Sequence, residues 1–132
     1  MPQSGRDNPK TSTAVAAGTA LTVTGNGTGQ DMRGCAEILA ILNVSAVSGS
    51  ASPTMNMKLQ VAPTLNGTYV DIPNAAFTAV TAAGRQALKV IGDQGVGFVR
   101  AAYTISGTSP SFTTSLELVG LLLHDTALAD AI

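Results

Sequence analysis

One sequence pattern occurs twice in the chain, as Val47-Ser48-Gly49-Ser50-Ala51-Ser52-Pro53-Thr54 and as Ile105-Ser106-Gly107-Thr108-Ser109-Pro110-Ser111. Glycine, serine and proline are typical of turns. An alternating stretch follows each copy: Met55-Asn56-Met57-Lys58-Leu59-Gln60-Val61 after the first and Phe112-Thr113-Thr114-Ser115-Leu116-Glu117-Leu118 after the second. A period of two indicates a strand with one buried and one solvent-facing side. We therefore predict two similar hairpins that supply the facing layers of one sandwich.

The rest of the chain also favours strands over helices. It is rich in Val, Ile and Thr, and Pro53, Pro63, Pro73 and Pro110 all stand at the edges of candidate segments. Strands are predicted over residues 20–24, 35–47, 54–62, 68–72, 76–81, 85–91, 96–105 and 111–123. The sequence thus predicts an all-β fold, an antiparallel β-sandwich of jelly-roll-like type.

Three regions are expected along the 132 residues. Residues 1–18 contain two prolines and a Thr/Ala/Gly tract in which Val15 is the one large apolar residue, so we expect a flexible, extended N-terminal arm that is either frayed or laid on a neighbour. Residues 19–123 form the sandwich domain. Residues 124–132 form an apolar C-terminal tail able to dock on a partner.

One predicted strand is apolar on both sides. Between Ala36 and Val44, one face carries alternating apolar residues, yet Leu39 and Ile41 on the opposite face are apolar too. Two explanations stay open: another segment of this chain packs across these residues, or they meet a second subunit.

Charged residues make up 11% of the chain, against roughly 25% in an ordinary soluble domain. With a formal net charge of -1 there is little self-repulsion between copies, so association with another protein surface is favoured; the alternative is a Thr-rich β surface that stays monomeric. Lys and Arg are scattered, which argues against nucleic-acid binding. They are Arg6, Lys10, Arg33, Lys58, Arg85, Lys89 and Arg100.

The sequence suggests synthesis in a cytoplasm and no membrane segment. Residues 1–10 lack the apolar stretch of a secretory signal, and the apolar run Leu118–Leu123 is far shorter than the ~20 residues of a membrane helix. Cys35 is the single cysteine, for which we expect a buried thiol.

No constellation of catalytic, metal-binding or cofactor-binding residues is found, so we expect no enzyme. His124 is the only histidine, and no G-x-S-x-G motif accompanies it. The glycine-rich stretch Gly92–Gly97 opens a strand and is interpreted as a hairpin connection, not a nucleotide loop. The carboxylates are expected at solvated strand ends, and Tyr69 and Tyr103 either at an interface or half-buried with exposed hydroxyls.

Two segments resemble small virion proteins of tailed bacteriophages. They run from Ser45 through the Gly49–Pro53 turn to the Leu65-Asn66-Gly67-Thr68-Tyr69-Val70-Asp71-Ile72 stretch, and from Phe98 to Pro110. In that group the corresponding stretch reads D-G-T-[YF]-x-D-I, and Asn66 here replaces the first aspartate. The resemblance covers about residues 35–120 and rests on turns and strand patterns.

The resemblance implies a decoration or cement protein that binds the exterior of a capsid and stabilises the shell. It implies the major capsid protein and further copies of this chain as partners, in a trimer or a dimer, and location on the virion surface. Tail, neck or baseplate components and virion-borne glycan-binding domains are the alternatives. The candidate protein-interface residues are Arg6, Lys10, Val15, Leu39, Ile41, Leu122, His124 and Leu128.

Overall fold

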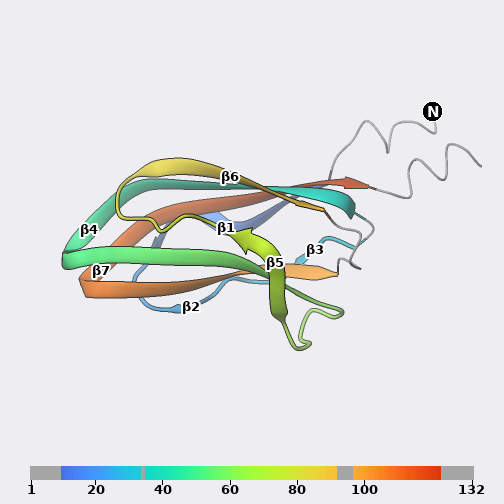
Figure 1. The fold of residues 1–132 in the computed structure, drawn as a ribbon, viewed down its shortest axis with the longest axis horizontal. Helices are drawn as coiled ribbons and strands as arrows, with labels where there is room; N and C mark the ends of the chain where they lie inside the picture. The colour runs from blue at the N-terminus through green and yellow to red at the C-terminus, as the bar shows by residue number, and fades with distance from the viewer. Residues whose placement is uncertain (1–9, 34, 92–96, 123–132) are drawn as a thin grey trace, which may run out of the picture.

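A computed structural model describes residues 10–33, 35–91 and 97–122, and these residues form antiparallel strands and no helix. The strands are β1 (Lys10–Leu21), β2 (Gly25–Asn26), β3 (Gln30–Asp31), β4 (Cys35–Ala62), β5 (Val70–Ala76), β6 (Gly84–Ile91) and β7 (Phe98–Leu122) (Figure 1). The described part of the chain thus holds no helix that could span a membrane.

Two long strands run through both layers of the sandwich. β4 and β7 pair with each other from Cys35 opposite Leu122 to Ala62 opposite Phe98, and both bend back at the same end of the molecule (Figure 1). The prediction of two hairpins is therefore wrong. The repeated motifs of glycine, serine and proline are corners inside continuous strands, because each motif finds its hydrogen-bonding partners in the other motif's strand and not within its own.

The corners divide the sheet into two packed layers. The first layer is ordered β1, the C-terminal half of β7, the N-terminal half of β4, then β6. The second is ordered β5, the C-terminal half of β4, the N-terminal half of β7, then the short β2 and β3. The predicted antiparallel β-sandwich is confirmed; the finer jelly-roll-like description stays a prediction.

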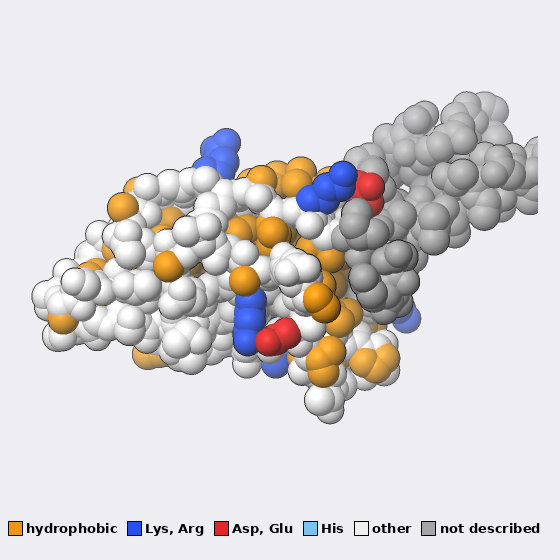
Figure 2. Space-filling model, in the orientation of Figure 1, with side chains coloured by type: hydrophobic (Ala, Val, Ile, Leu, Met, Phe, Trp, Pro, Cys, Tyr) orange, Lys and Arg blue, Asp and Glu red, His pale blue; other side chains and the backbone are white. Residues whose placement is uncertain are grey.

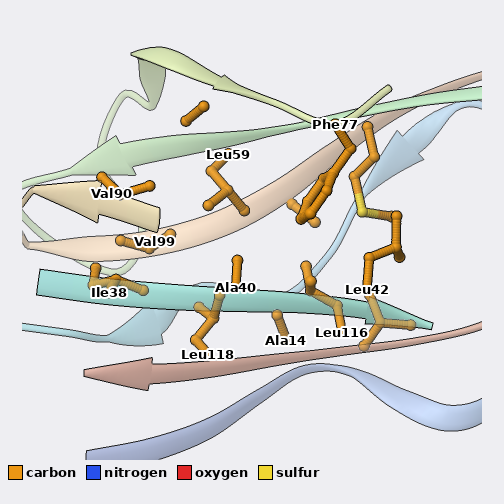
Figure 3. Packing of buried hydrophobic residues seen from close by; sticks show 14 of the residues in the cluster. Ala14, Ile38, Ala40, Leu42, Leu59, Phe77, Val90, Val99, Leu116 and Leu118 are labelled. Atoms are coloured by element: carbon orange, nitrogen blue, oxygen red, sulfur yellow. The ribbon is translucent and has the colours of Figure 1, made fainter. Parts of the chain in front are cut away.

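The alternating side chains meet between the layers, as predicted. Met55, Met57 and Leu59 from the second layer and Phe112, Leu116 and Leu118 from the first are all buried. Figure 3 shows Leu59 and Phe77 on one side of this core and Ala40, Leu116 and Leu118 on the other. Cys35 is buried as expected. Burial of apolar area at roughly 25 cal/mol per Å² is the main force holding the two layers together.

Part of the predicted N-terminal arm belongs to the sandwich. Residues 10–18 lie within β1, which pairs with β7 from Lys10 opposite Gly120 to Leu21 opposite Phe112. The strand is irregular, since residues 16–18 bulge between Val15 and Thr19. The expectation of a flexible arm is therefore wrong for residues 10–18, which pair with β7. Val15 within this range and Leu21 at the end of the same strand are buried, and their burial holds β1 against the core. Residues 1–9 and 123–132 lie outside the described residues.

Three predicted strands also change. The strands expected over 68–72 and 76–81 are replaced by β5 and a single bridge between Met55 and Val80. Of the strand expected over 20–24, only residues 20 and 21 are in a strand, as the end of β1. The glycine-rich stretch after it contains the short β2 and β3, which pair with β7. The turn at Asn66-Gly67 is present, closed by the Gly67 amide donating to the Thr64 carbonyl. Most of Gly92–Gly97 lies outside the described residues.

Candidate functional site

Of the predicted interface residues, the structure describes the side chains of Val15, Leu39 and Ile41. Arg6, His124 and Leu128 lie outside the described residues; Lys10 and Leu122 lie at the ends of β1 and β7, where the structure does not describe their side chains. Val15 is only 6% exposed and belongs to the core, so it has no surface to offer a partner.

Leu39 and Ile41 lie side by side on the outer face of the first layer. Leu39 stands opposite Val119 on one side and Lys89 on the other, and it is 40% exposed. Ile41 is half-buried. Within the described part of the chain, both residues are thus partly covered and partly exposed, so the two explanations for this apolar face stay open.

A connected set of polar side chains lies at the surface of the second layer, and we call it the Arg100 cluster. It consists of Lys58, Gln60, Tyr69, Asp71 and Arg100, contributed by β4, the approach to β5, β5 and β7. The register of the sheet brings them together, because Gln60 stands opposite Arg100 on one side and Asp71 on the other.

Gln60 is the centre of the cluster. Its carbonyl Oε1 accepts a 2.9 Å hydrogen bond from Arg100 Nε, and its amide Nε2 donates a 2.9 Å bond to Asp71 Oδ1. The other oxygen of Asp71 accepts from Lys58 Nζ at 2.9 Å. The hydrogen bonds from Gln60 and Lys58, in that order, hold the pKa of Asp71 below its ordinary value, because both stabilise the carboxylate form.

Tyr69 covers the guanidinium of Arg100. The Arg100 Cζ lies 4.1 Å from the centroid of the Tyr69 ring, a cation–π distance. The Tyr69 hydroxyl donates a 2.8 Å bond to the Leu65 carbonyl, which closes the segment between β4 and β5 over this end of the layer. A Cβ atom on Gly29 would overlap the Tyr69 hydroxyl, so a glycine at position 29 leaves the space that the ring occupies.

A second arginine is held by an aromatic ring but differs in its partner. Arg33 Cζ lies 4.9 Å from the Phe98 ring centroid, and its Nε and one terminal nitrogen each donate a 2.8 Å bond to the Asp31 carboxylate. That hydrogen bonding and the charge of Asp31 raise the pKa of Arg33. Arg33 therefore has its carboxylate within the chain, whereas Arg100 is bonded to a neutral amide.

The remaining carboxylates of the described residues lie at the surface with partners. Glu37 pairs with Lys89 at 3.6 Å, and Glu117 accepts hydrogen bonds from the Thr13 hydroxyl. No group of three potential metal ligands occurs in the ranges that the structure describes. These side chains act as surface ion pairs and hydrogen-bond acceptors, in agreement with the expectation of solvated carboxylates.

Sequence reasoning did not find the Arg100 cluster. It placed Tyr69 at an interface or half-buried with an exposed hydroxyl, and Tyr69 is indeed half-buried, but its hydroxyl is bonded to Leu65. In the sequence, Arg100 and Lys58 are two of several scattered cations. The available signal was weak: Gln60, Asp71 and Arg100 occupy outward positions in three strands, and their proximity depends on a strand pairing that local patterns do not specify.

Comparison with known proteins identifies a fold and no family. No family model matches the chain, and no curated protein matches it. Among solved structures, the SPBc2 prophage-derived protein YomS is similar, with a TM-score of 0.53 at 14% identity over 86% of this chain and 93% of YomS.

Two similar structures come from much longer chains. The VP2 subviral particle of infectious bursal disease virus matches with a TM-score of 0.55 at 14% identity, over 94% of this chain and 35% of that one. A Clostridium thermocellum xylanase 10B chain, with CBM22-1 and GH10 modules and complexed with xylohexaose, matches with a TM-score of 0.53 at 9% identity, over 84% and 24% respectively. At such identities the likeness establishes the β-sandwich alone, on which different functions are built.

Proposed function

We propose that this chain is a structural protein of a bacteriophage particle, and specifically a decoration or cement protein that binds the capsid exterior and stabilises the shell. The observation that carries the proposal is the match of nearly the whole sandwich to a prophage-derived protein and to a protein of a viral particle. The sequence resemblance to small phage virion proteins agrees with it.

The surface of the molecule supports a role in close association. On the face seen in Figure 2, charged side chains are few, some basic groups lie next to acidic ones, and most of the face consists of uncharged polar and apolar atoms. Such a surface loses little hydration energy on contact, because desolvating an unpaired charge is the costly part of forming an interface.

The proposed partners are the major capsid protein and further copies of this chain, in a trimer or a dimer; neither nucleic acid nor a membrane is a proposed partner. Many copies on a lattice, each with a standard contact of about 1,200–2,000 Å², stabilise a shell cooperatively because neighbouring sites are occupied together.

The proposed role is passive. The chain would act by binding and not by catalysis; the described carboxylates lie at the surface, each in an ion pair or hydrogen bond with a neighbouring side chain.

Imaging of particles with and without this chain tests the proposal. We expect particles from a deletion strain to lack density on the capsid exterior and to regain it when purified protein is added. Quantitative mass spectrometry should give a copy number comparable to that of the coat protein. A copy number corresponding to one ring would place the chain in the tail or neck instead, and complete absence from purified virions would overturn the proposal.

A glycan-binding role on the same virion is the second candidate. A groove of about 350 Å³ lies over the second layer, lined in part by Asn26, Asn56 and Thr104, whose amide and hydroxyl groups can bond to sugar hydroxyls. Binding of the isolated chain to a glycan array, with loss on Asn56→Ala, would favour this candidate over capsid decoration.

A further inference from the structure

The guanidinium of Arg100 is fixed in orientation, but in the described part of the chain only its Nε donates a hydrogen bond. Tyr69 covers one face of the group and Gln60 accepts a hydrogen bond from Nε. The described residues provide no further hydrogen bond or ion pair to its two terminal nitrogens. A guanidinium offers five N–H donors in a planar fork that matches a carboxylate.

The neighbouring acid does not neutralise Arg100. Both oxygens of Asp71 already accept bonds from other groups, one from Gln60 and one from Lys58. Gln60 is placed between the acid and the arginine, so it orients Arg100 without supplying a negative charge. Lys58, Asp71 and Arg100 together leave one net positive charge on a chain whose formal net charge is -1.

Arg33 shows what the complete arrangement looks like on this molecule. There an aromatic ring and a carboxylate engage the guanidinium together, with two 2.8 Å bonds to Asp31. At Arg100 the ring is present and the carboxylate is absent from the described residues. Within the described residues, the terminal nitrogens of Arg100 are thus able to donate hydrogen bonds to a carboxylate of another molecule.

An exposed apolar side chain borders the same site. Leu65, whose carbonyl holds Tyr69, is 47% exposed. Val70 is also exposed, but it stands opposite Val61, which packs on the core, and so lies on the other face of the sheet. An arginine and a tyrosine held in place beside an exposed aliphatic group have the composition of an interface centre, where a few such residues supply most of the binding energy.

We propose that the Arg100 cluster is a docking site for an acidic side chain of a partner protein, with Arg100 binding the carboxylate bidentately and Leu65 contacting an apolar residue beside it. That the partner is the coat protein rests on the proposed function. A nucleic acid is a poorer match, because Arg100 and Lys58 are too few to neutralise a run of phosphates.

The first test needs no capsid. Arginine side-chain signals of the ¹⁵N-labelled protein are followed by NMR during titration with acetyl-Leu-Glu-Leu amide, and with acetyl-Leu-Gln-Leu amide as the neutral control. We expect the acidic peptide alone to shift the Arg100 signals at millimolar concentration while those of Arg33 stay unchanged. Equal effects of both peptides, or no shift at Arg100, would overturn the inference whether or not the chain binds capsids.

The second test uses capsids from a phage that lacks this protein. Arg100→Gln is expected to weaken binding by roughly tenfold or more, the worth of a charge-assisted hydrogen-bonded pair, and Arg100→Lys to restore only part of it. The matched control is Arg33→Gln, which removes another ring-stacked arginine and should leave binding unchanged. Urea unfolding of each variant separates loss of docking from loss of folding.

The outcomes distinguish the two proposals. If the wild-type chain does not bind capsids, the proposed function fails and the peptide titration still decides the docking site. If the wild-type chain binds and Arg100→Gln binds equally well, the docking site is wrong for the coat protein and the proposed function stands.

Discussion

Gly49 lies directly against Pro110: a Cβ atom built on Gly49 would stand 2.9 Å from the Cα of Pro110. The glycine of the second motif lies against the proline of the first in the same way, since a Cβ atom on Gly107 would stand 2.8 Å from the Cα of Pro53. Each corner motif thus supplies a glycine for the proline of the other. Both glycines also have positive φ angles, 120° and 115°, which side-chain-bearing residues rarely adopt.

Replacing either corner glycine is expected to destabilise the sandwich. Gly49→Ala and Gly107→Ala combine a strained backbone with a collision against backbone atoms, so each should lower the free energy of unfolding by about 1–3 kcal/mol. Urea denaturation followed by circular dichroism measures the effect.

Gly84→Ala is the matched control for these variants. Gly84 begins β6, has no positive φ, and would place an added Cβ atom in open space, with no other atom within 4 Å. We expect a change within about 0.5 kcal/mol. Corner variants as stable as Gly84→Ala would show that the corner does not require glycine.

Ala51 is expected to be better replaced by glycine. Ala51 and Ser52 have φ angles of 60° and 54°, in the left-handed region. Ala51→Gly removes the steric strain of a Cβ atom in the left-handed conformation, which costs roughly 1–2 kcal/mol. Glycine also raises the conformational entropy of the unfolded chain, which lowers the free energy of unfolding by about 0.5–1 kcal/mol. The net free energy of unfolding should therefore rise slightly. Ala87→Gly, an exposed strand position without this backbone conformation, should instead lose about 0.5–1 kcal/mol. Equal losses in both variants under urea would contradict the expectation.

Asp71 is expected to link stability to acid pH. Gln60 and Lys58 lower the pKa of Asp71 in the folded state. Its ionised carboxylate therefore adds to the free energy of unfolding at pH values above the pKa that Asp71 has in the unfolded chain. This stabilisation is lost as the pH falls through the lower folded-state pKa. Thermal unfolding should therefore show a Tm that decreases below about pH 4, with a smaller decrease in Asp71→Asn. If the Tm of the wild-type protein and that of Asp71→Asn depend on pH in the same way, Asp71 is not the cause of the acid destabilisation.

The core alternation gives a fourth expectation. Leu118 is fully buried between the layers, so Leu118→Ala should cost about 2–5 kcal/mol through lost apolar contact and a cavity. Val23, which is exposed, serves as the control, and Val23→Ala should change stability by less than about 0.5 kcal/mol. Calorimetric unfolding of both variants compares them, and similar losses would place Leu118 outside the core.

Strand character and facing direction could be predicted from local sequence. Met55, Met57 and Leu59 point inward because strand side chains alternate between faces whatever the strand's partner is. The positions of bends were also visible as glycine, serine and proline. The meaning of the bends was not, because the same residues serve a hairpin turn and a corner within a strand.

The Arg100 cluster shows the same limit for function. Residues 60, 69, 71 and 100 are separated along the chain, and a shift of the β4–β7 pairing by one residue would turn Gln60 away from Arg100. Similarly, the small residues of β1 predicted an arm without support, yet β7 supplies an edge to which residues 10–18 pair.

The amino-acid sequence by itself determined that this protein is built of strands, which side of each strand is apolar, and that its surface carries few charges, because these properties depend on residue type and a period of two. The tertiary structure alone decided that β4 and β7 pass through both layers and that Arg100 meets Gln60 and Tyr69. Those features depend on long-range pairing, which the whole core stabilises and no short segment encodes.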